Sequence, residues 1–331
     1  MKICIVGAGG IGATLGARLA STGHEVSVIA RGPHLATLRE RGLTLVDHVN
    51  GGESTWRVRA ARDPADLEPQ DLVFLGLKAY SIPAMAARLG PLLGEHTVVV
   101  PAINGVPWWY FHKLPGPMSG HSLRCLDPSG QLFAALDPDR LLGCVVHIAA
   151  ELRAPGEVHY TGGRRLILGE LDQRDTPRLR QVCSLLTQAG FDAQLSRDIR
   201  RDVWTKLIGN LSFNPVAAMT GYLMNEICAD AEVLQVIRAM MIEGMTVAEH
   251  YGVHIGMNPD QRIDLARQLG AAKISMLQDL EARRTLELDA IVGAVIELAE
   301  LAGIAVPTVR HVHALTAARA RALRIAPAPQ E

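Results

Sequence analysis

Three polar residues, Lys206, Asn210 and Asn214, recur at helical spacing in the second half of the chain. Residues four apart lie on the same face of an α-helix, so these three form one row. A lysine ammonium beside two amides can donate a hydrogen bond to a carbonyl oxygen and anchor a carboxylate. The alternative is the solvated side of an amphipathic helix, although that side usually carries charges rather than asparagine. We expect the row to bind a small substrate.

A glycine-rich loop near the N-terminus indicates a second kind of chemistry. It lies between an apolar strand predicted at Lys2–Val6 and a helical run at Ala13–Ser21, and its residues match G-x-G-x-x-G: Gly7, Ala8, Gly9, Gly10, Ile11 and Gly12. In this context Gly7 permits a tight turn, Gly9 lets the backbone approach a pyrophosphate, and Gly12 allows close packing of helix on strand. The phosphates would bind at the positive end of the helix, so the loop predicts a dinucleotide site.

The end of the second predicted strand, Val26–Ile29, indicates which dinucleotide binds. An acidic residue there would accept hydrogen bonds from the ribose hydroxyls of NAD, but this chain has Arg31. A guanidinium can pair with a 2′-phosphate through two parallel hydrogen bonds. NADP(H) is therefore the expected cofactor, and a solvated loop arginine is the alternative.

Three further polar residues stand at positions that a core does not explain. Lys78 follows a strand predicted at 71–77 and Asn104 follows one at 97–100, which places both at the carboxyl edge where doubly wound sheets bind ligands. Their structural alternatives are a solvated lysine and an Asn-Gly turn. Glu287 falls in the first turn of a helix predicted over 286–302, where the helix dipole stabilises any carboxylate.

Composition excludes several classes of protein. Of 331 residues, 48% are apolar, and 33 basic residues balance 34 acidic ones, so global disorder and sequence-independent binding of nucleic acid or anionic lipid are not expected. Five scattered cysteines and twelve histidines show neither a disulfide framework nor a metal-ligand spacing, so we expect no metal. With no leader pattern and no long apolar run, a cytoplasmic chain acting on a small molecule is expected.

Strand–helix–strand alternation in the first half predicts a doubly wound parallel sheet, and the second half reads as helical. We expect an α/β, cofactor-binding domain over 1–195 and an all-helical domain for substrate binding or dimerisation over 196–331. Short strands at 141–150 and 157–168 suggest an antiparallel extension of the sheet. The segment Pro107–Arg140 reads as an insertion or long loop on the surface. Helices are expected at 79–93, 197–211, 229–249, 260–281, 286–302 and after Pro307, with a frayed tail at 326–331.

Taken together, the motifs resemble those of the ketopantoate reductase (2-dehydropantoate 2-reductase) family over nearly the whole chain. The blocks G-A-G-G-I-G, L-K-A, I-N-G-V, W-T-K-L-I-G-N-L-S-F-N-P, S-M-L-Q-D, L-E-L-D and G-I-A-V-P-T occur in that family's order and approximate spacing. The resemblance implies a Rossmann-type domain and a helical domain with the active site in the cleft between them. It also implies NADPH-dependent reduction of ketopantoate to (R)-pantoate, on the route to pantothenate and coenzyme A.

The resemblance also assigns roles on the substrate side. Lys206 is implied as the proton donor to the developing alkoxide. Asn210 and Asn214 are implied to bind substrate, with Ser275 contacting its carboxylate. Asn104 is implied to contact both the substrate and the nicotinamide side of the cofactor. This set fits the reaction, because reduction of a 2-keto acid needs an acid at the carbonyl oxygen and an anchor for the anion.

The remaining implied roles concern the cofactor. Lys78 is implied to lie near it, and Glu287 to contact the nicotinamide ribose or to orient the lysine. Ala150, expected in the turn after the strand at 141–150, is implied as a backbone contact.

Some positions depart from the family pattern. Trp108, Trp109 and Tyr110 follow the Asn104 motif, where they could reshape the substrate pocket or anchor the insertion. Met224 stands where the family often has another asparagine, and Leu286 where it often has threonine. A related NADP-dependent reductase of another 2-oxo acid, with a bulkier or more apolar tail, is therefore an alternative. A non-catalytic NADP(H)-binding sensor is a further alternative. The presence of Lys206, Asn104 and Glu287 together argues against it. The size of the chain and its helix-rich second half suggest a homodimer.

Overall fold

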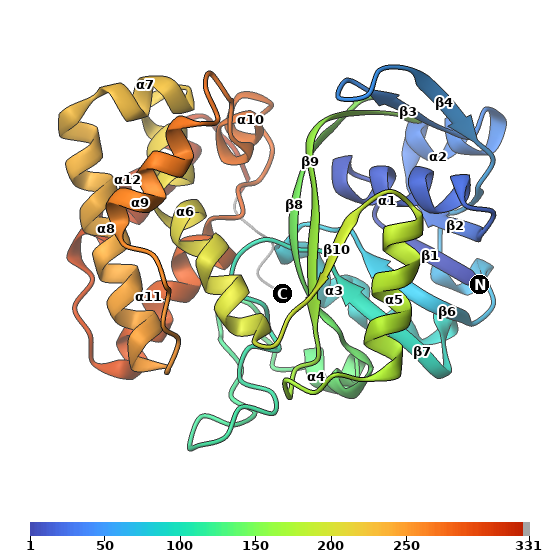
Figure 1. The fold of residues 1–331 in the computed structure, drawn as a ribbon, viewed down its shortest axis with the longest axis horizontal. Coiled ribbons are helices and arrows are strands. Elements are labelled where there is room, and N and C mark those ends of the chain that lie inside the picture. The colour runs from blue at the N-terminus through green and yellow to red at the C-terminus, as the bar shows by residue number, and fades with distance from the viewer. Residues whose placement is uncertain (327–331) are drawn as a thin grey trace. The chain divides into compact units, whose positions relative to one another are not determined.

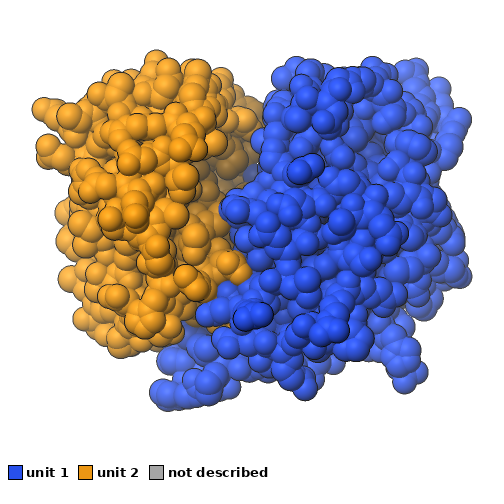
Figure 2. All heavy atoms as spheres, in the orientation of Figure 1, with its two compact units in different colours: residues 1–103, 111–121, 130–199 blue, residues 104–110, 122–129, 200–331 orange. Residues whose placement is uncertain are grey.

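A computed structural model describes residues 1–326, which form two compact units (Figures 1 and 2). Unit 1 contains residues 1–103, 111–121 and 130–199, and unit 2 contains residues 104–110, 122–129 and the chain from 200 onward. The main division therefore follows Ile199, close to the expected boundary after residue 195. Two short segments from the first half join the helical unit.

Unit 1 is built on a five-stranded parallel sheet in the order β5-β2-β1-β6-β7. Its strands are β1 (Lys2–Val6), β2 (Glu25–Ile29), β5 (Arg59–Ala61), β6 (Gln70–Leu75) and β7 (Leu93–Pro101). The predicted parallel sheet is confirmed, and β1 matches its predicted bounds. Because β1 pairs with β2 on one side and β6 on the other, the strand order reverses at β1, where such sheets bind ligands at their carboxyl ends.

A second five-stranded sheet in unit 1 has the order β10-β9-β3-β4, with β8 pairing β9. It contains β3 (Leu43–Asp47), β4 (Glu53–Trp56), β8 (Gly143–Ala154), β9 (Glu157–Gly169) and β10 (Asp192–Leu195). The predicted strands at 141–150 and 157–168 are β8 and β9, and they pair antiparallel as expected. The expectation that they extend the first sheet holds only at Leu141, which forms a parallel bridge with Val99 of β7. Beyond that point β8 pairs with β9, and β9 pairs with β3 and β10 of the second sheet.

The helices of unit 1 are short apart from two. They are α1 (Gly10–Ser21), α2 (Gly32–Glu40), α3 (Ile82–Ala86), α4 (Leu132–Ala135) and α5 (Pro177–Gln188), with 3-10 turns η1 (Pro64–Asp66), η2 (Ala79–Ser81), η3 (Gly90–Leu92) and η4 (Pro138–Arg140). The single helix expected at 79–93 is instead η2, α3 and η3. Pro83 is in the first turn of α3, where its missing N–H costs nothing, but Pro91 cannot continue that helix.

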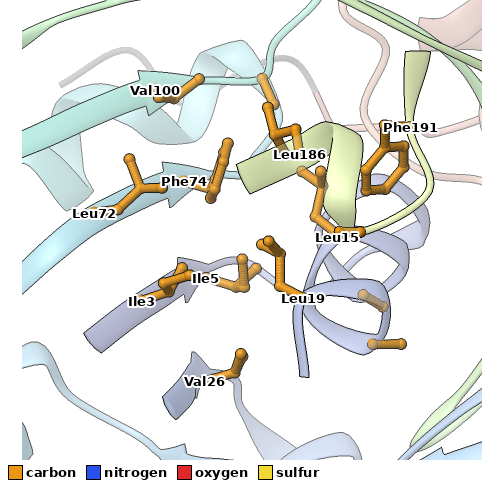
Figure 3. Close-up of a cluster of buried hydrophobic side chains, with 14 of the residues drawn as sticks. Ile3, Ile5, Leu15, Leu19, Val26, Leu72, Phe74, Val100, Leu186 and Phe191 are labelled. Carbon is orange, nitrogen blue, oxygen red and sulfur yellow. The ribbon is translucent and has the colours of Figure 1, made fainter. Parts of the chain in front are cut away.

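The core of unit 1 joins both sheets through α1. This helix contacts β1 and β2 of the first sheet and β3, β8 and β9 of the second. Figure 3 shows Leu15 and Leu19 of α1 together with Ile3 and Ile5 of β1, and all four are fully buried. Burying such large aliphatic side chains stabilises the fold by about 1.5–3 kcal/mol each, which fixes the glycine loop at the start of α1.

Unit 2 is helical. Its elements are α6 (Ile199–Thr220), α7 (Met224–Ala229), α8 (Ala231–His250), α9 (Pro259–Arg267), α10 (Ser275–Glu281), a π-helical turn η5 (Asp289–Gly293), α11 (Ala294–Ala302) and α12 (Pro307–Ala322). Gly303 ends α11 with a positive φ of 68° and Pro307 begins α12, as predicted. Within residues 1–326, no helix has the length and apolar character needed to cross a membrane.

Two predicted helix bounds are wrong. The helix expected at 197–211 continues to Thr220 and passes through Pro215. The helix expected at 260–281 is two helices, because the chain leaves helical geometry at Gly270, whose φ is +60°. Of the tail expected to fray, all but Ala326 lies outside the described residues.

The segment Pro107–Arg140 contains only α4 and η4 as regular elements. Its expected surface position is wrong for the first residues. The side chains of Trp108, Trp109, Tyr110 and Phe111 are at most 3% exposed, because aromatic rings carry a large apolar area that folding removes from water.

Candidate active site

The polar row predicted at Lys206, Asn210 and Asn214 lies on α6, as its spacing requires. Lys206 and Asn210 are half-buried, whereas Asn214 is only 4% exposed. The side-chain nitrogen of Asn214 is buried without a hydrogen-bond partner in the described part of the chain. A buried donor of this kind carries a desolvation cost that a ligand oxygen would offset.

Lys206 begins a hydrogen-bonded chain that runs through Asn104 to Glu287. The Lys206 Nζ donates to the Asn104 Oδ1 over 2.7 Å, and the Asn104 Nδ2 donates to the Glu287 Oε2 over 3.4 Å. The three residues belong to unit 2, although they are far apart in the sequence. The amide oxygen thus faces the ammonium and the amide nitrogen faces the carboxylate, so each charge meets the correct end of the amide dipole.

Asn104 is positioned by the residues that follow it. Gly105 has a φ of +85°, and a Cβ there would lie 2.5 Å from the carbonyl carbon of Ala290. The Val106 N–H donates to the Ala290 carbonyl oxygen over 2.8 Å. The chain therefore bends at Gly105, and the contact with Ala290 fixes the backbone next to Asn104. Ala290 is a site residue that no sequence pattern pointed to, although the glycine of I-N-G-V is a signal for a close backbone approach.

Glu287 lies just before η5 rather than inside the first helical turn. Its carbonyl accepts from the Ile291 N–H over 3.1 Å, and its side chain is 5% exposed between buried Leu286 and Leu288. Turns of π-helix occur often at functional sites. Ser275 is the first residue of α10, and its side chain is exposed.

The glycine loop of unit 1 has the close backbone approaches that the motif predicts. Gly7 has a φ of +95°, and a Cβ at Gly12 would lie 3.1 Å from the Ile5 side chain. A Cβ at Gly10 would lie 2.7 Å from the carbonyl carbon of Ala150. Gly9 is exposed, and a Cβ there would have no neighbour closer than 4.0 Å. The loop thus leaves open space at Gly9 beside the N-terminus of α1, which fits a pyrophosphate.

Ala150 therefore lies next to the glycine loop, but not in a turn. It is inside β8, which continues to Ala154, so its expected position after the strand is wrong. The strand is longer than predicted because the pairing with β9 continues through this region despite irregularities in register.

Arg31 and Lys78 follow β2 and β6 at the carboxyl edge of the first sheet. Arg31 is exposed and Lys78 is half-buried. Near Arg31, the backbone N–H of Ala65 and the Arg88 guanidinium hold the pKa of the Asp63 carboxyl below its ordinary value, and Arg31 adds to the effect. Asp63 is thus largely engaged by other donors, and the exposed Arg31 is compatible with an added phosphate.

The aromatic cluster after Asn104 is tied to α6. The Trp204 Nε1 donates to the Tyr110 hydroxyl over 2.7 Å, and the Arg200 Nε donates to the Tyr110 carbonyl over 2.7 Å. Both α6 residues are almost fully buried. The sequence left open whether the aromatic residues reshape the substrate pocket or anchor the insertion. For Tyr110, these contacts favour a role in anchoring the insertion to α6.

Comparisons with known proteins place the chain in a family. The family described as "Ketopantoate reductase PanE/ApbA" matches residues 3–173, and its C-terminal counterpart matches residues 198–320. The chain belongs to the ketopantoate reductase family. A 2-dehydropantoate 2-reductase from Mesorhizobium japonicum is 43% identical over 316 residues, which cover 95% of this chain and 96% of the relative.

Solved structures of the ketopantoate reductase family have the same fold. A structure from Ralstonia solanacearum, described as a candidate ketopantoate reductase, has a TM-score of 0.93 and 40% identity and covers 98% of this chain and 99% of its own. The 2-dehydropantoate 2-reductase from Geobacter metallireducens has a TM-score of 0.84 and 28% identity. The match covers 96% of this chain and 99% of the Geobacter chain. The family resemblance and the fold class expected from the sequence are confirmed.

Proposed function

We propose that this chain reduces 2-dehydropantoate (ketopantoate) to (R)-pantoate with NADPH. The observation that carries the proposal is the hydrogen-bonded chain from Lys206 through Asn104 to Glu287. A carbonyl that accepts hydride develops negative charge on its oxygen, so an ammonium held in a partly buried site stabilises that charge and supplies the proton. The 43% identical 2-dehydropantoate 2-reductase supports the same assignment.

Lys206 and Glu287 are the proposed catalytic residues. Lys206 Nζ donates its proton to the forming alkoxide, and Asn104, the proposed contact to both substrate and nicotinamide, holds the amine through its amide oxygen. Glu287, fixed by buried Leu286 and Leu288, orients the Asn104 amide and contacts the nicotinamide ribose. A flipped or absent amide would leave the lysine without this restraint, which lowers the rate of a positioned proton transfer.

The proposed cofactor is NADP(H), which supplies the hydride when bound. Gly7 to Gly12 would hold the pyrophosphate at the N-terminus of α1, and the open position at Gly9 supports this. Arg31 would pair with the 2′-phosphate. Lys78 and the Ala150 backbone complete the proposed cofactor site, and the contact of Ala150 with Gly10 supports its inclusion.

Asn210, Asn214 and Ser275 are the proposed substrate-binding residues. The unpartnered side-chain nitrogen of Asn214 supports a role in binding a ligand oxygen. The identity of the keto acid is less constrained, because Met224, at a position where the family often has asparagine, is buried and apolar. A 2-oxo acid with a bulkier, more apolar tail is therefore the second candidate substrate.

We place the reaction in the cytoplasm, on the route to pantothenate and coenzyme A, with the enzyme as a homodimer. Residues 1–195 would bind the cofactor, and the helical residues from 196 onward would bind substrate and the second subunit. Sedimentation equilibrium tests the assembly, and a monomer mass at every concentration would reject it.

The deciding experiment follows NADPH oxidation with ketopantoate beside branched and aromatic 2-oxo acids. Preferential turnover of ketopantoate supports the proposal. Turnover of another keto acid, with ketopantoate inert, would support the second candidate. Binding of NADPH without turnover of any keto acid would favour a non-catalytic sensor and contradict both.

A further inference from the structure

Arg262 lies against the helix that carries Lys206. It is in the first turn of α9, whose start is fixed by a capping box: the Asn258 side chain accepts from the Gln261 N–H over 2.9 Å, and the Gln261 side chain accepts from the Asn258 N–H over 2.9 Å. From there the Arg262 guanidinium reaches Gly209 of α6. A Cβ at Gly209 would lie 2.7 Å from the Arg262 Cζ and 2.9 Å from its Nε.

Gly209 therefore makes room for this arginine. The glycine is in the middle of α6, with φ in the ordinary range, so no turn requires it there. Glycine inside a helix is less favourable than alanine, because its backbone loses more conformational freedom on folding. The contact with Arg262 gives a physical reason for a glycine at position 209.

The Arg262 guanidinium forms no hydrogen bond or ion pair with any other residue in the range 1–326. The side chain is partly buried, and burial alone lowers its pKa from the ordinary value. Neighbouring arginines behave differently, because Arg238 pairs with Asp260 and Arg267 pairs with Asp264. A partly desolvated charge without a partner is unfavourable, and a bound anion would offset that cost.

The residues of α6 that flank Gly209 indicate which anion the Arg262 guanidinium would bind. Gly209 is three residues after Lys206 and one before Asn210. Residues three apart on a helix are neighbours, with Cβ atoms about 5–6 Å apart. The Arg262 guanidinium, which packs on Gly209, is thus beside the polar row on α6 that begins with Lys206, the proposed proton donor. In a 2-oxo acid the carboxylate is bonded directly to the keto carbon, so an anchor for the carboxylate must lie near the acid that protonates the keto oxygen.

We propose that Arg262 binds the carboxylate of the 2-oxo acid substrate. Its planar fork matches a carboxylate through two parallel hydrogen bonds, while Lys206 faces the keto oxygen. Ser275, a neutral donor, can share the same carboxylate but supplies no charge. This inference rests on the proposed function, since it assumes a 2-oxo acid at the Lys206 row.

The test compares a 2-oxo acid with its neutral primary amide as substrates for the holoenzyme. Wild type is expected to prefer the acid. Arg262→Met is expected to lose about 10- to 100-fold in kcat/KM for the acid and to change little for the amide, because only the acid carries the charge that the fork recognises. Arg262→Lys should recover part of the preference. Arg267→Met, on the same helix, is the matched control and should behave as wild type.

Gly209→Ala provides a second route to the same outcome. The added methyl group displaces the guanidinium without removing the charge, so the acid-over-amide preference should fall while the melting temperature shows that the fold is retained. Equal losses for acid and amide in Arg262→Met would overturn the inference, because they would mean a structural role. An Arg262→Met enzyme that matches Arg267→Met would also overturn it.

These outcomes are separable from a failure of the proposed function. If wild type does not reduce ketopantoate, the acid–amide comparison is made with whichever 2-oxo acid it reduces. If it reduces none, calorimetric binding of pantoate to the enzyme with NADP present replaces turnover. Binding that is unchanged in Arg262→Met, or binding that is absent in wild type, would then reject the anchor.

Discussion

The ammonium of Lys206 donates a 2.7 Å hydrogen bond to the amide oxygen of Asn104, a residue 102 positions earlier in the chain. This contact restrains a long, flexible side chain at one point. Lysine has three donors and one of them is directed at Asn104, so proton donation and positioning are compatible in one residue.

Replacing Lys206 removes the proposed proton donor. Lys206→Ala is expected to lower kcat for keto-acid reduction by about 10²- to 10⁴-fold, the usual contribution of a positioned acid, without changing NADPH affinity. Steady-state NADPH oxidation and fluorescence titration of NADPH measure the two quantities. Lys273→Ala is the control, since Lys273 pairs with Glu281 at an exposed site of unit 2. A Lys206→Ala enzyme with the wild-type rate would reject Lys206 as the acid.

Asn104 links both charged members of the site. Asn104→Leu is expected to lower kcat by about 10- to 100-fold, because the replacement leaves Glu287 and Lys206 without the amide between them. Asn225→Leu, at an exposed asparagine of α7, should leave the rate unchanged. A loss of stability that accounts for the whole loss of activity in Asn104→Leu would count against a positioning role, so urea unfolding is measured alongside.

Adjacent glycines of the nucleotide loop should respond differently to the same methyl group. Gly9→Ala has room for a Cβ, so we expect normal stability but weaker NADPH binding, because the methyl group occupies the approach of the pyrophosphate. Gly10→Ala meets the Ala150 carbonyl, so it should lower the melting temperature as well. Thermal unfolding with and without NADPH measures both. Tight NADPH binding by Gly9→Ala would contradict the assignment of the loop.

Arg31 is expected to select NADPH over NADH. Arg31→Asp should shift the ratio of kcat/KM values toward NADH by more than about tenfold, because it removes a charged hydrogen-bond donor and places a carboxylate near the 2′-phosphate. The exposed Arg41, replaced by Asp, is the control for a change of net charge. If Arg31→Asp kept its full preference for NADPH, a residue other than Arg31 would have to bind the 2′-phosphate.

The hydroxyl of Tyr110 is expected to act in stability rather than in specificity. Tyr110→Phe leaves the buried Trp204 Nε1 without its acceptor, at a cost of about 1–3 kcal/mol in the free energy of unfolding. Urea denaturation measures this cost, and Tyr222→Phe at an exposed tyrosine should be neutral. If Tyr110→Phe instead changed the order of preferred keto acids at unchanged stability, the cluster would belong to the substrate pocket.

The sequence alone determined the elements whose local signals are strong. The continuous apolar run of β1 and the glycines after it specify a buried strand and a tight turn, and the four-residue spacing of Lys206, Asn210 and Asn214 specifies one helix face. The weaker elements were missed, such as β3 and β5, which are short and only partly apolar, so neither hydrophobic period stands out.

Only the tertiary structure decided which distant residues meet. The residue patterns predicted chemistry at Lys206, Asn104 and Glu287 one by one, and the family resemblance implied that Glu287 could orient the lysine. The hydrogen bonds through Asn104, however, depend on Gly105 docking against Ala290, which no local pattern encodes. The unpaired guanidinium of Arg262 over Gly209 likewise could not be inferred, because neither residue is unusual among its sequence neighbours. Local propensity is set by a few adjacent residues, whereas the composition of a site is set by packing between segments far apart in the chain.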